Sequence, residues 1–521
     1  MTDLATTYIS TTIPYVNAAP HVGFALELVQ TDALARFARL AGERVITSTG
    51  TDDHSLKNVR AAEAAGEPVR ALIERQATAF VSLADALDAP FDARICTSRD
   101  ARHAASVARL FRACASRGDL YRRRYRGLYC VGCERFYAPD ELERGLCSEH
   151  ARAPEPVEEE NWFFRLSRHG AALLEAIERG RLRIVPEERR NEVIAFVRAG
   201  LEDFSVSRSS ERARGFGVPV PGDAAQVVYV WFDALANYLT VFDYGALGER
   251  CGWQSAGRRV HVLGKGVLRF HAVYWPAILL AAGLELPTEL RVHGHLTVDG
   301  KKIGKSLGNG VDPAALIDAH GATALRHYLL RHIPAFKDAD FSAQRLREAH
   351  DSELADELGN LVRRVLVLAH RHTNGRLPLI GELGNDESAL EAAVLALPGR
   401  LDAAFAGHEL GAGYDAVWEL VRATNRYLER AAPWQLARSA GCDPLAAQRL
   451  ATVLGSALAA LRALAPSLAP FVPKLASELA ACVGARLEPG CLRAFAPFRA
   501  SPSGEPLALP PLLAPRLVAR R

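Results

Sequence analysis

A histidine and a glycine stand in a segment that could bind a nucleotide. The segment Pro20-His21-Val22-Gly23-Phe24 lies between a short β-branched run and a helical pattern. In open α/β folds, such a turn sits at the carboxyl edge of a parallel sheet, where ligands bind. His21 could donate a hydrogen bond to a phosphate at the helix N-terminus, and Gly23 would let an adenine approach the backbone closely. Taken alone, the tripeptide His-x-Gly more often indicates an ordinary loop.

A second segment carries lysines that could hold a polyphosphate. It reads Lys301-Lys302-Ile303-Gly304-Lys305-Ser306. Lys302 and Lys305, three residues apart on a loop that contains a glycine, could clamp the phosphates and neutralise the charge as pyrophosphate leaves. For this segment in isolation, a solvated basic loop is the more common interpretation.

Three cysteines and a histidine have the spacing of a metal site. They follow the pattern Cys130-x2-Cys133-x13-Cys147-x2-His150. Two such pairs can surround one Zn²⁺ tetrahedrally, and four protein ligands leave no open position, so the zinc would be structural. The alternative is that these residues are ordinary thiols. The other six of the nine cysteines are scattered, which is typical of a reduced cytosolic protein.

The elements around these segments indicate an α/β fold followed by a helical region. Strands alternate with helices in the first part of the chain, which predicts a parallel doubly wound sheet. Periodicity is lost from Tyr121 to about Trp162, which indicates an insertion. The α/β pattern resumes near Val227, in the run VVYVWF, and again at Val260–Leu263. From about Gln344 to Ala481, helical spacing with short breaks predicts an antiparallel bundle. The predicted early strands are Tyr8–Thr12 and Val45–Thr49, and the predicted early helices are Gly23–Ala41, Glu67–Leu87 and Arg102–Ser116.

Length and composition predict a soluble protein of several domains. The chain has 521 residues, which is too long for one ordinary core. With 49% hydrophobic and 24% charged residues it has globular composition, and a net charge of +3 neither requires nor excludes a nucleic-acid partner. The first residues do not resemble a signal peptide, and the apolar segment Ala451–Pro473 carries Arg462 and several prolines. We therefore expect a cytoplasmic protein that does not enter a membrane.

Together, these and further segments resemble one family. A His-x-Gly turn after the first strand and a Lys-x-x-Lys-Ser loop about 280 residues later resemble the two signatures of class I aminoacyl-tRNA synthetases. Over about residues 8 to 475, the order and spacing of further motifs resemble the methionyl-tRNA synthetases. These motifs are Thr11–Asn17 (TTIPYVN), Gly50–His54 (GTDDH), Tyr229–Ala234 (YVWFDA), Phe270-His271, Tyr274–Pro276 and Val292–Gly300 (VHGHLTVDG).

The resemblance implies a domain order. A Rossmann-type catalytic domain, built on a parallel doubly wound sheet, would be split by a connective insertion with a zinc knuckle, and an all-α anticodon-binding bundle would follow. The expected ranges are 1–118 and 226–343 for the two catalytic halves, 119–225 for the insertion, 344–490 for the bundle and 491–521 for an extended tail. The chain would act as a monomer with one structural zinc.

The resemblance also implies an activity and its residues. L-Methionine and ATP, accompanied by Mg²⁺, would give methionyl-adenylate and pyrophosphate, and the methionyl group would pass to the 3′ end of the methionine tRNA, which carries a CAU anticodon. The catalytic residues would be His21, Lys302 and Lys305, and ATP would also contact Gly23, Gly264 and Ser306. Methionine would be bound by Ile13, Tyr15, Asp52, Trp231, Ala234, Leu235, Tyr238, Val267, Phe270 and His271. An aromatic and aliphatic enclosure suits a thioether. The anticodon would be read by Asn360, Arg364 and Trp434.

Four positions depart from the family pattern. Phe24 replaces a second histidine, Gly266 replaces an aspartate that would hold a ribose hydroxyl, Ile303-Gly304 replaces Met-Ser, and Ser55 stands where glycine is usual. Losing one charge-assisted hydrogen bond costs about 1.5–3 kcal/mol, which slows an enzyme without abolishing its activity. We expect an active enzyme. Two alternatives stay open: a catalytically weakened tRNA-binding paralogue, and a synthetase for a methionine analogue or for inhibitor resistance.

Overall fold

The protein forms two compact units, each built from several stretches of the chain. A computed structural model describes residues 6–130, 135–137, 141–147, 152–246, 252–298, 300–302, 310–509 and 513–517. The first unit comprises Met1–Pro20, Ile46–Ala84 and Phe91–His293. The second unit comprises His21–Val45, Asp85–Pro90 and Gly294–Arg521.

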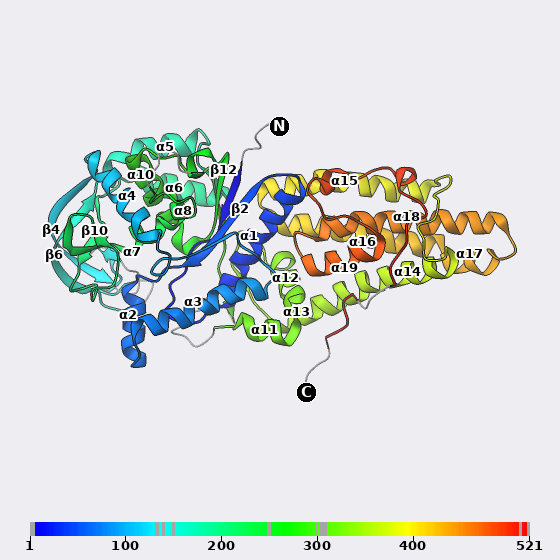
Figure 1. The fold of residues 1–521 in the computed structure, drawn as a ribbon, viewed down its shortest axis with the longest axis horizontal. Coiled ribbons are helices and arrows are strands. Elements are labelled where there is room, and N and C mark those ends of the chain that lie inside the picture. The colour runs from blue at the N-terminus through cyan, green and yellow to red at the C-terminus, as the bar shows by residue number, and fades with distance from the viewer. Residues whose placement is uncertain are drawn as a thin grey trace. The chain divides into compact units, whose positions relative to one another are not determined.

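The first unit contains the predicted parallel sheet. Its six strands lie in the order β3-β2-β1-β12-β13-β7 (Figure 1). Strand β1 pairs in parallel with β12, about 250 residues further along the chain, and β12 pairs in parallel with β13. All four residues of β1 are buried, as expected for a strand in the middle of such a sheet. The bounds are β1 Thr7–Ser10, β2 Val45–Thr51, β3 Ala93–Cys96, β7 Arg183–Val185, β12 Arg258–Gly264 and β13 Glu289–His293.

A glycine allows β2 and β3 to pair closely near their carboxyl ends. A Cβ atom on Gly50 would lie 1.9 Å from the carbonyl oxygen of Ile95 and 3.1 Å from Cγ2 of Ile13. Only a residue without a side chain fits there. The backbone just before Asp52 is therefore closely packed against Ile95 and Ile13.

The segment that lacks periodicity in the sequence is a long antiparallel ribbon. Strand β4 (Leu120–Cys130) pairs with β6 (Glu155–Phe164), from Leu120 opposite Phe164 to Tyr129 opposite Glu155. Arg124 faces Glu160 and Arg126 faces Glu158, so opposite charges lie across the ribbon. The short strands β5 (Arg135–Tyr137) and β8 (Phe204–Ser205) complete this sheet.

The prediction of a returning α/β strand near Val227 was wrong. Strand β11 (Asp223–Val228) pairs antiparallel with β9 (Ser207–Ser209) and β10 (Pro219–Val220) in a separate three-stranded sheet. The run VVYVWF is divided, because Tyr229 is the N-cap of helix α7 (Val230–Leu235). Another strand rejoins the parallel sheet instead: β7, which lies inside the range expected for the insertion, pairs in parallel with β13.

Helices cover the rest of the first unit. The fully buried Trp253 and Trp275 lie in its main hydrophobic core, together with Tyr8 from β1. A short π-helical segment, Phe270–Tyr274, leads into α10. The helices are α2 Leu56–Ala65, α3 Val69–Ala86, α4 His103–Ser116, α5 Gly170–Glu178, α6 Glu187–Arg198, α8 Asn237–Thr240, α9 Gly252–Ser255 and α10 Trp275–Ala282; the last two residues of α3 belong to the second unit.

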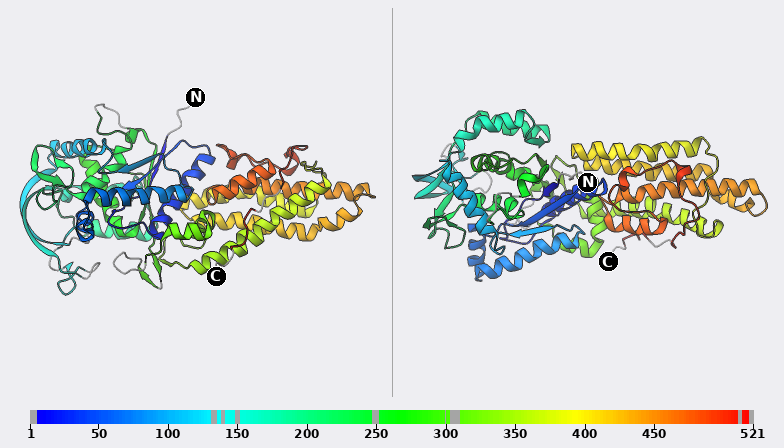
Figure 2. Two further views of the ribbon diagram at one scale, coloured as in Figure 1. Left: turned by 60° about the horizontal axis from the view of Figure 1, so that its bottom comes forward. Right: turned by 45° about the horizontal axis from the view of Figure 1, so that its top comes forward.

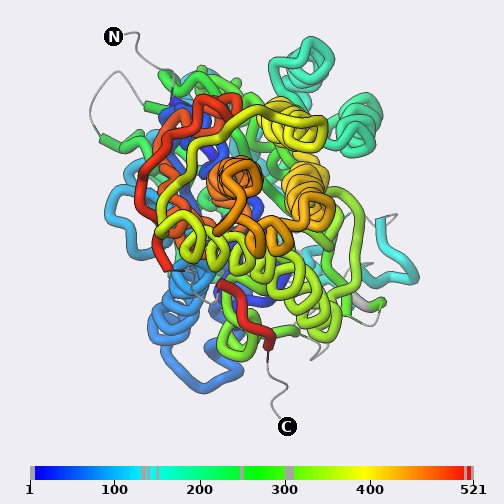
Figure 3. Tube along the Cα trace, turned by 90° about the vertical axis from the view of Figure 1, so that its right-hand side faces the viewer, coloured from blue at the N-terminus to red at the C-terminus, as the bar shows by residue number. Residues whose placement is uncertain are grey.

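The second unit is mainly helical, which confirms the predicted helical C-terminal region. Figures 1 and 2 show its long helices lying alongside one another, and Figure 3 looks along them. The unit also contains a small sheet of β14 (Leu296–Val298), β15 (Lys301–Lys302) and β16 (Ala339–Asp340). Its helices are α1 Val22–Leu40, α11 Pro313–His320, α12 Ala322–Arg331, α13 Ala343–Ala349, α14 Asn360–His372, α15 Asn385–Gly407, α16 Leu410–Ala431, α17 Pro433–Ser439, α18 Pro444–Leu468 and α19 Pro473–Val483, with a π-helical segment, His350–Gly359, between α13 and α14. By length and composition α18 could cross a membrane, but 89% of its most apolar window is buried, as in the core helix of a soluble protein.

A buried ion pair connects α1 with α12. Arg326 and Asp32 are each 1% exposed, and Nη2 of Arg326 lies 2.7 Å from Oδ2 of Asp32. The guanidinium also donates to the carbonyl oxygens of Leu87, Pro470 and Phe471. Because the guanidinium meets both a carboxylate and three carbonyl groups, its charge is compensated in the core.

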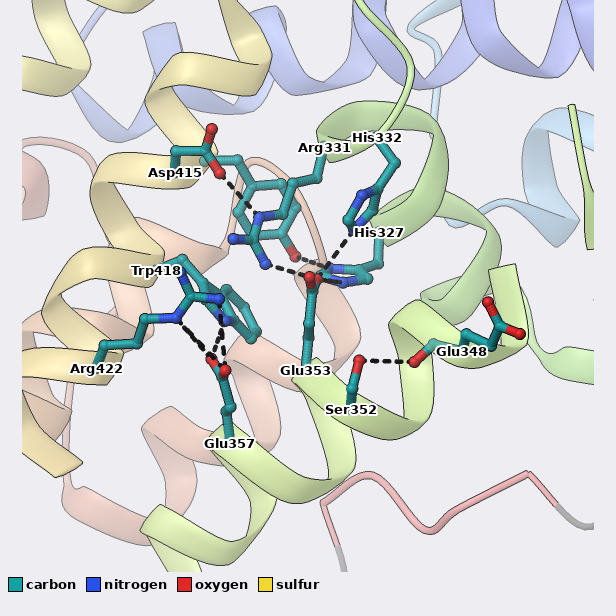
Figure 4. Close-up of polar contacts among 11 residues, drawn as sticks. His327, Arg331, His332, Glu348, Ser352, Glu353, Glu357, Asp415, Trp418 and Arg422 are labelled. Carbon is teal, nitrogen blue, oxygen red and sulfur yellow. Dashed lines mark hydrogen bonds and ion pairs between the residues drawn. The ribbon is translucent and has the colours of Figure 1, made fainter. Parts of the chain in front are cut away.

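A second, partly buried cluster connects α12 with the π-helical segment and α16 (Figure 4). Oε2 of Glu353 accepts from Nε2 of His327 at 2.6 Å, Nε2 of His332 at 3.0 Å and Nη1 of Arg331 at 2.5 Å. Nδ1 of His327 lies 2.9 Å from the Tyr414 hydroxyl on α16. Burial lowers the pKa of His327 to about 4, although Glu353 opposes this. Burial raises the pKa of Glu353, but the surrounding donors lower it more, so the carboxyl is held ionised.

His327 makes the stability of the second unit depend on pH. Its pKa in the folded protein lies below the value of about 6.5 in an unfolded chain. The folded state therefore binds fewer protons, and this contribution is complete above the unfolded pKa and is lost as the pH falls towards 4. As the pH falls from about 7.5 to about 5, loss of this contribution should reduce the free energy of unfolding by roughly 2 kcal/mol. Urea unfolding followed by circular dichroism should show a smaller pH dependence in His327→Gln. The exposed His372→Gln should behave like the unchanged protein, and an equal pH dependence in all three would contradict the assignment.

Candidate active site

Asp52 is held at the carboxyl end of β2. Its carboxylate is buried, its backbone N–H donates to the carbonyl oxygen of Pro14 at 2.9 Å, and its backbone forms an isolated bridge with Tyr15. The side-chain amide of Asn58, in the first turn of α2, donates to the carbonyl oxygens of Asp52 and Asp53. Ser55 caps this helix by accepting from the backbone N–H of Lys57, which gives the departure at Ser55 a local structural role. An acidic group is thus positioned at the edge of the sheet.

Aromatic rings lie near Asp52, whose backbone bridges to that of Tyr15. The rings of Trp231, on α7, and Phe270 stack with their centroids 3.5 Å apart and their planes 5° apart. Tyr15 meets Trp231 edge-on, at 6.2 Å and 71°. The π-helical turn at Phe270 therefore presents one ring to the other, and the two together form an apolar wall.

A histidine and a tyrosine supply polar groups to the same wall. Nδ1 of His271 lies 2.9 Å from the carbonyl oxygen of Val267. Only a protonated nitrogen can donate to a carbonyl, so Nδ1 carries the proton of the neutral ring. Nε2 is then the acceptor for the Tyr238 hydroxyl, 2.8 Å away. Both side chains are buried, as are Ala234 and Leu235, whereas Ile13 and Val267 are partly buried. All ten residues predicted for the amino-acid pocket lie in the first unit, and direct contacts connect several of them.

Asp233 is a residue that the sequence analysis missed. It is fully buried on α7, between Trp231 and Ala234. Oδ2 lies 2.6 Å from Nδ1 of His54, and Oδ1 lies 2.8 Å from Nε2 of His103 on α4. Burial raises the pKa of Asp233, but the two histidines lower it well below its usual range. The one available signal was an acidic residue inside the apolar run VWFDAL.

This carboxylate positions the pocket. His54 follows Asp52 and Asp53 at the end of β2, and burial lowers its pKa less than the charge and hydrogen bond of Asp233 raise it, so the net pKa is raised. The end of β2 and the helix that carries Trp231 are therefore joined through a single buried anion. Asp233 acts through these neighbours and is a positioning residue.

His21 lies in the second unit as the N-cap of α1. Its Nδ1 accepts from the backbone N–H of Gly23 at 3.1 Å. A Cβ atom on Gly23 would come within 2.8 Å of the His21 ring, so the glycine allows the ring to fold back over the helix start. Phe24 is only 8% exposed and packs into the core. The residue in place of the family's second histidine is therefore a packing residue.

Of the other residues predicted to bind ATP, only some lie within the described structure. Lys302 belongs to β15, whose backbone pairs with Thr297 of β14, and Lys305 and Ser306 lie outside the described residues. Gly264 ends β12 in the first unit, where a Cβ atom would approach the His293 ring to 3.3 Å. Gly266 lies in the single 3₁₀ turn that follows.

Two of the four predicted zinc ligands are described. Cys130 ends β4 and Cys147 lies after it; both are buried, and they share a small cluster with Tyr137. The Cys147 thiol lies 3.3 Å from the Tyr137 hydroxyl. Two buried thiols in one cluster fit a zinc knuckle, while Cys133 and His150 lie outside the described residues.

His327, His332 and Glu353 form another group that could hold a metal, since their ligand atoms lie within 4.8 Å of one another. Figure 4 shows Arg331 directed at the same carboxylate. Its guanidinium, 2.5 Å from Oε2 of Glu353, already neutralises that oxygen. A divalent cation would have to displace it, so the group is a structural ion cluster.

The three predicted anticodon residues lie in the helical unit. Asn360 and Arg364 are exposed on α14. The Arg364 guanidinium bonds to the side-chain oxygen of Asn425 on α16, the helix that ends at Ala431, shortly before Trp434. Trp434 is 40% exposed, which is unusual for a large aromatic side chain.

Comparisons with known proteins agree with this arrangement. The family described as "tRNA synthetases class I (M)" matches residues 7–153 and 137–366. A methionine–tRNA ligase of Brucella suis biovar 1 is 38% identical, with 98% of each chain covered. The chain belongs to the methionyl-tRNA synthetase family. The Mycobacterium tuberculosis methionyl-tRNA synthetase, solved with methionyl-adenylate, superimposes with a TM-score of 0.92 at 36% identity and covers 98% of this chain. A methionine–tRNA ligase of Rhizobium meliloti is 38% identical over 100% of this chain and 99% of its own.

Removing the charge of Asp233 should destabilise this methionyl-tRNA synthetase family member. Asp233→Asn keeps the shape of the side chain but leaves two histidine donors with one acceptor, so the free energy of unfolding should fall by roughly 3 kcal/mol. Chemical unfolding followed by tryptophan fluorescence measures this change. Asp243→Asn is the control, because its carboxylate is 60% exposed and pairs with Arg102 at the surface, so it should cost less than about 1 kcal/mol. Equal losses in the two variants would contradict the role given to Asp233.

Proposed function

We propose that the protein is a methionine–tRNA ligase, which activates L-methionine with ATP and transfers it to the 3′ end of the methionine tRNA. The observation that carries this proposal is the pocket in the first unit: a buried carboxylate, Asp52, beside an aromatic wall of Trp231 and Phe270. A carboxylate suits the ammonium group of an amino acid, and an aromatic wall suits a thioether.

Each residue of the pocket has a proposed role. Asp52 accepts from the substrate ammonium. Trp231, Phe270 and Tyr15 contact the methionine side chain, together with Ile13, Ala234, Leu235 and Val267. The Tyr238 hydroxyl, which donates to Nε2 of His271, limits the far end of the pocket. A longer or charged side chain would have to break this buried hydrogen bond, which is how the pocket would select methionine.

The ATP phosphates would be held by the two signatures. His21, with Nδ1 accepting from Gly23, can present Nε2–H to a phosphate oxygen. Lys302 and Lys305 would neutralise the charge that develops as pyrophosphate leaves, and Gly23, Gly264 and Ser306 would contact the nucleotide. Mg²⁺ would accompany ATP. The carboxylate of methionine would attack the α-phosphorus directly, so catalysis would depend on positioning and electrostatics without a covalent enzyme intermediate.

The remaining assignments concern zinc and tRNA. Cys130, Cys133, Cys147 and His150 would hold one structural Zn²⁺, which would fix the tip of the β4–β6 ribbon. Asn360, Arg364 and Trp434 would read the CAU anticodon, with the exposed indole stacking on an unpaired base. The expected domain ranges, a cytoplasmic location and a monomeric state complete the proposal.

Methionine-dependent exchange of pyrophosphate into ATP tests the activity directly. The purified protein should catalyse exchange with methionine and not with other amino acids, and Lys305→Ala should reduce the rate by one to two decades or more. No exchange with any amino acid, combined with intact tRNA binding, would show that the protein is a tRNA-binding paralogue. Preference for an analogue over methionine would indicate a different substrate.

Trp434→Ala tests the anticodon assignment. Stacking of a base on an aromatic ring is worth about 1–3 kcal/mol, so the KM for tRNA should rise about 10-fold or more. Exchange, which needs no tRNA, is the internal reference. Leu445→Ala removes a still more exposed apolar side chain, on α18; it is the control and should leave the KM for tRNA unchanged. Equal effects of both variants would show that Trp434 has no special contact with tRNA.

A further inference from the structure

A small cavity in the first unit is lined by residues from the segments that also carry part of the proposed amino-acid pocket. Its volume is about 30 Å³, and its wall includes His54 and Tyr229. His54 stands two residues after Asp52, and Tyr229 stands two residues before Trp231. The cavity wall therefore includes parts of the same two chain segments that carry Asp52 and Trp231, but it is lined by a different set of side chains. The others with polar or aromatic groups are Tyr129, Arg208, Arg212 and Phe216.

Arg212 is a cation whose charge is incompletely matched. Its side chain is 15% exposed, and Nη1 and Nη2 are buried without a hydrogen bond to any described residue. The Glu159 carboxylate lies 3.9 Å from Nη1, too far for a hydrogen bond, and it already accepts from Ser209 and Asn161. Burial lowers the pKa of Arg212. The charge of Glu159 opposes this and the charge of Arg208 adds to it, so the net pKa is lowered. A buried guanidinium whose terminal nitrogens have no hydrogen-bond partner among the described residues is costly, which points to a ligand.

Arg208 adds a second cation beside the first. Its guanidinium donates to the Ser205 hydroxyl and to the carbonyl oxygen of Ser207, both neutral acceptors. Both guanidinium groups lie over the ring of Tyr129, Arg212 at 4.2 Å and Arg208 at 5.2 Å from the centroid, and Arg208 also lies 4.3 Å from the Tyr229 centroid. The aromatic rings hold two like charges side by side against the cavity.

We propose that this cavity binds a phosphate group of the tRNA acceptor end, with Arg208 and Arg212 as its donors. This inference rests on the proposed function. Planar guanidinium groups are suited to phosphate oxygens. A volume of 30 Å³ holds about two atoms the size of a water molecule, which matches the two non-bridging oxygens of a phosphodiester. A phosphate held there would fix the 3′ end of the strand next to the amino-acid pocket. Free pyrophosphate is the other source of the same chemistry.

Arg212→Gln separates the two sources. If the phosphate belongs to tRNA, kcat/KM for tRNA in aminoacylation should fall roughly 10- to 100-fold, several times more than any fall in methionine-dependent exchange. Removal of the 3′-terminal CCA from the tRNA should abolish the difference in affinity between Arg212→Gln and the unchanged protein in filter binding. Arg212→Lys should recover part of the loss. Arg214→Gln, a neighbouring arginine whose side chain is 66% exposed, should leave both reactions unchanged.

Each other outcome overturns the proposal in a recognisable way. A raised KM for pyrophosphate in exchange, with tRNA charging unchanged, would assign the site to the free anion. An equal loss in both reactions together with a lowered Tm would show a structural arginine, and no change at all would show a water-filled cavity. If the unchanged protein lacked exchange, the proposed function would fail, and filter binding with intact and CCA-less tRNA would still decide whether Arg212 contacts the acceptor end.

Discussion

A charge can lie inside a protein only where opposite charge or hydrogen bonds replace the water that it loses. Among the residues that the structure describes, Asp233, Arg326 and Glu353 meet that condition, and each joins separate segments of the chain. Asp233 joins the end of β2, α4 and α7 through His54 and His103. Arg326 joins α12 to α1 through Asp32. Glu353 joins the π-helical segment to α12 through three donors. Apolar packing alone tolerates small shifts, whereas these contacts require specific partners and so define one arrangement within each unit.

The proposed active site depends on the first of these groups. The pocket combines a carboxylate at a strand end with rings on a short helix and a π-helical turn, and none of these elements is long enough to be rigid by itself. The buried Asp233 carboxylate fixes the strand end and the helix to one another. Two of the departures from the family pattern also have structural roles: Ser55 caps α2, and Phe24 packs in the core. Each of these roles lies within the unit that contains the residue.

Much of the fold could be predicted from the sequence wherever the pattern of residues is local. The structure confirms strands β1 and β12, helix α1 and the helical region, because the pattern of each is contained in a short stretch of sequence. The β4–β6 ribbon could not be predicted, because its arginines and glutamates hide the alternation of apolar residues. The partners of Asp233 lie 179 and 130 residues away, so no local pattern reveals them. Strand β11 was misassigned because an apolar run does not say which sheet it joins. The roles of all the predicted site residues stay predictions, and Cys133, His150, Lys305 and Ser306 also lie outside the described residues.

The ribbon formed by β4 and β6 also bears on how a polyanion would approach. Arg122 pairs with Asp223 at 3.2 Å and with Glu160 at 3.6 Å, and Arg124 pairs with Glu158 at 3.6 Å. In the linear sequence, the arginines from Arg122 to Arg126 form a basic strip; in the folded chain each paired charge is half of a dipole only a few ångströms long. The fields of such dipoles largely cancel within the screening length of about 8 Å in physiological salt. The ribbon therefore produces only a weak electrostatic potential at long range. RNA would be attracted to these arginines only at contact distance.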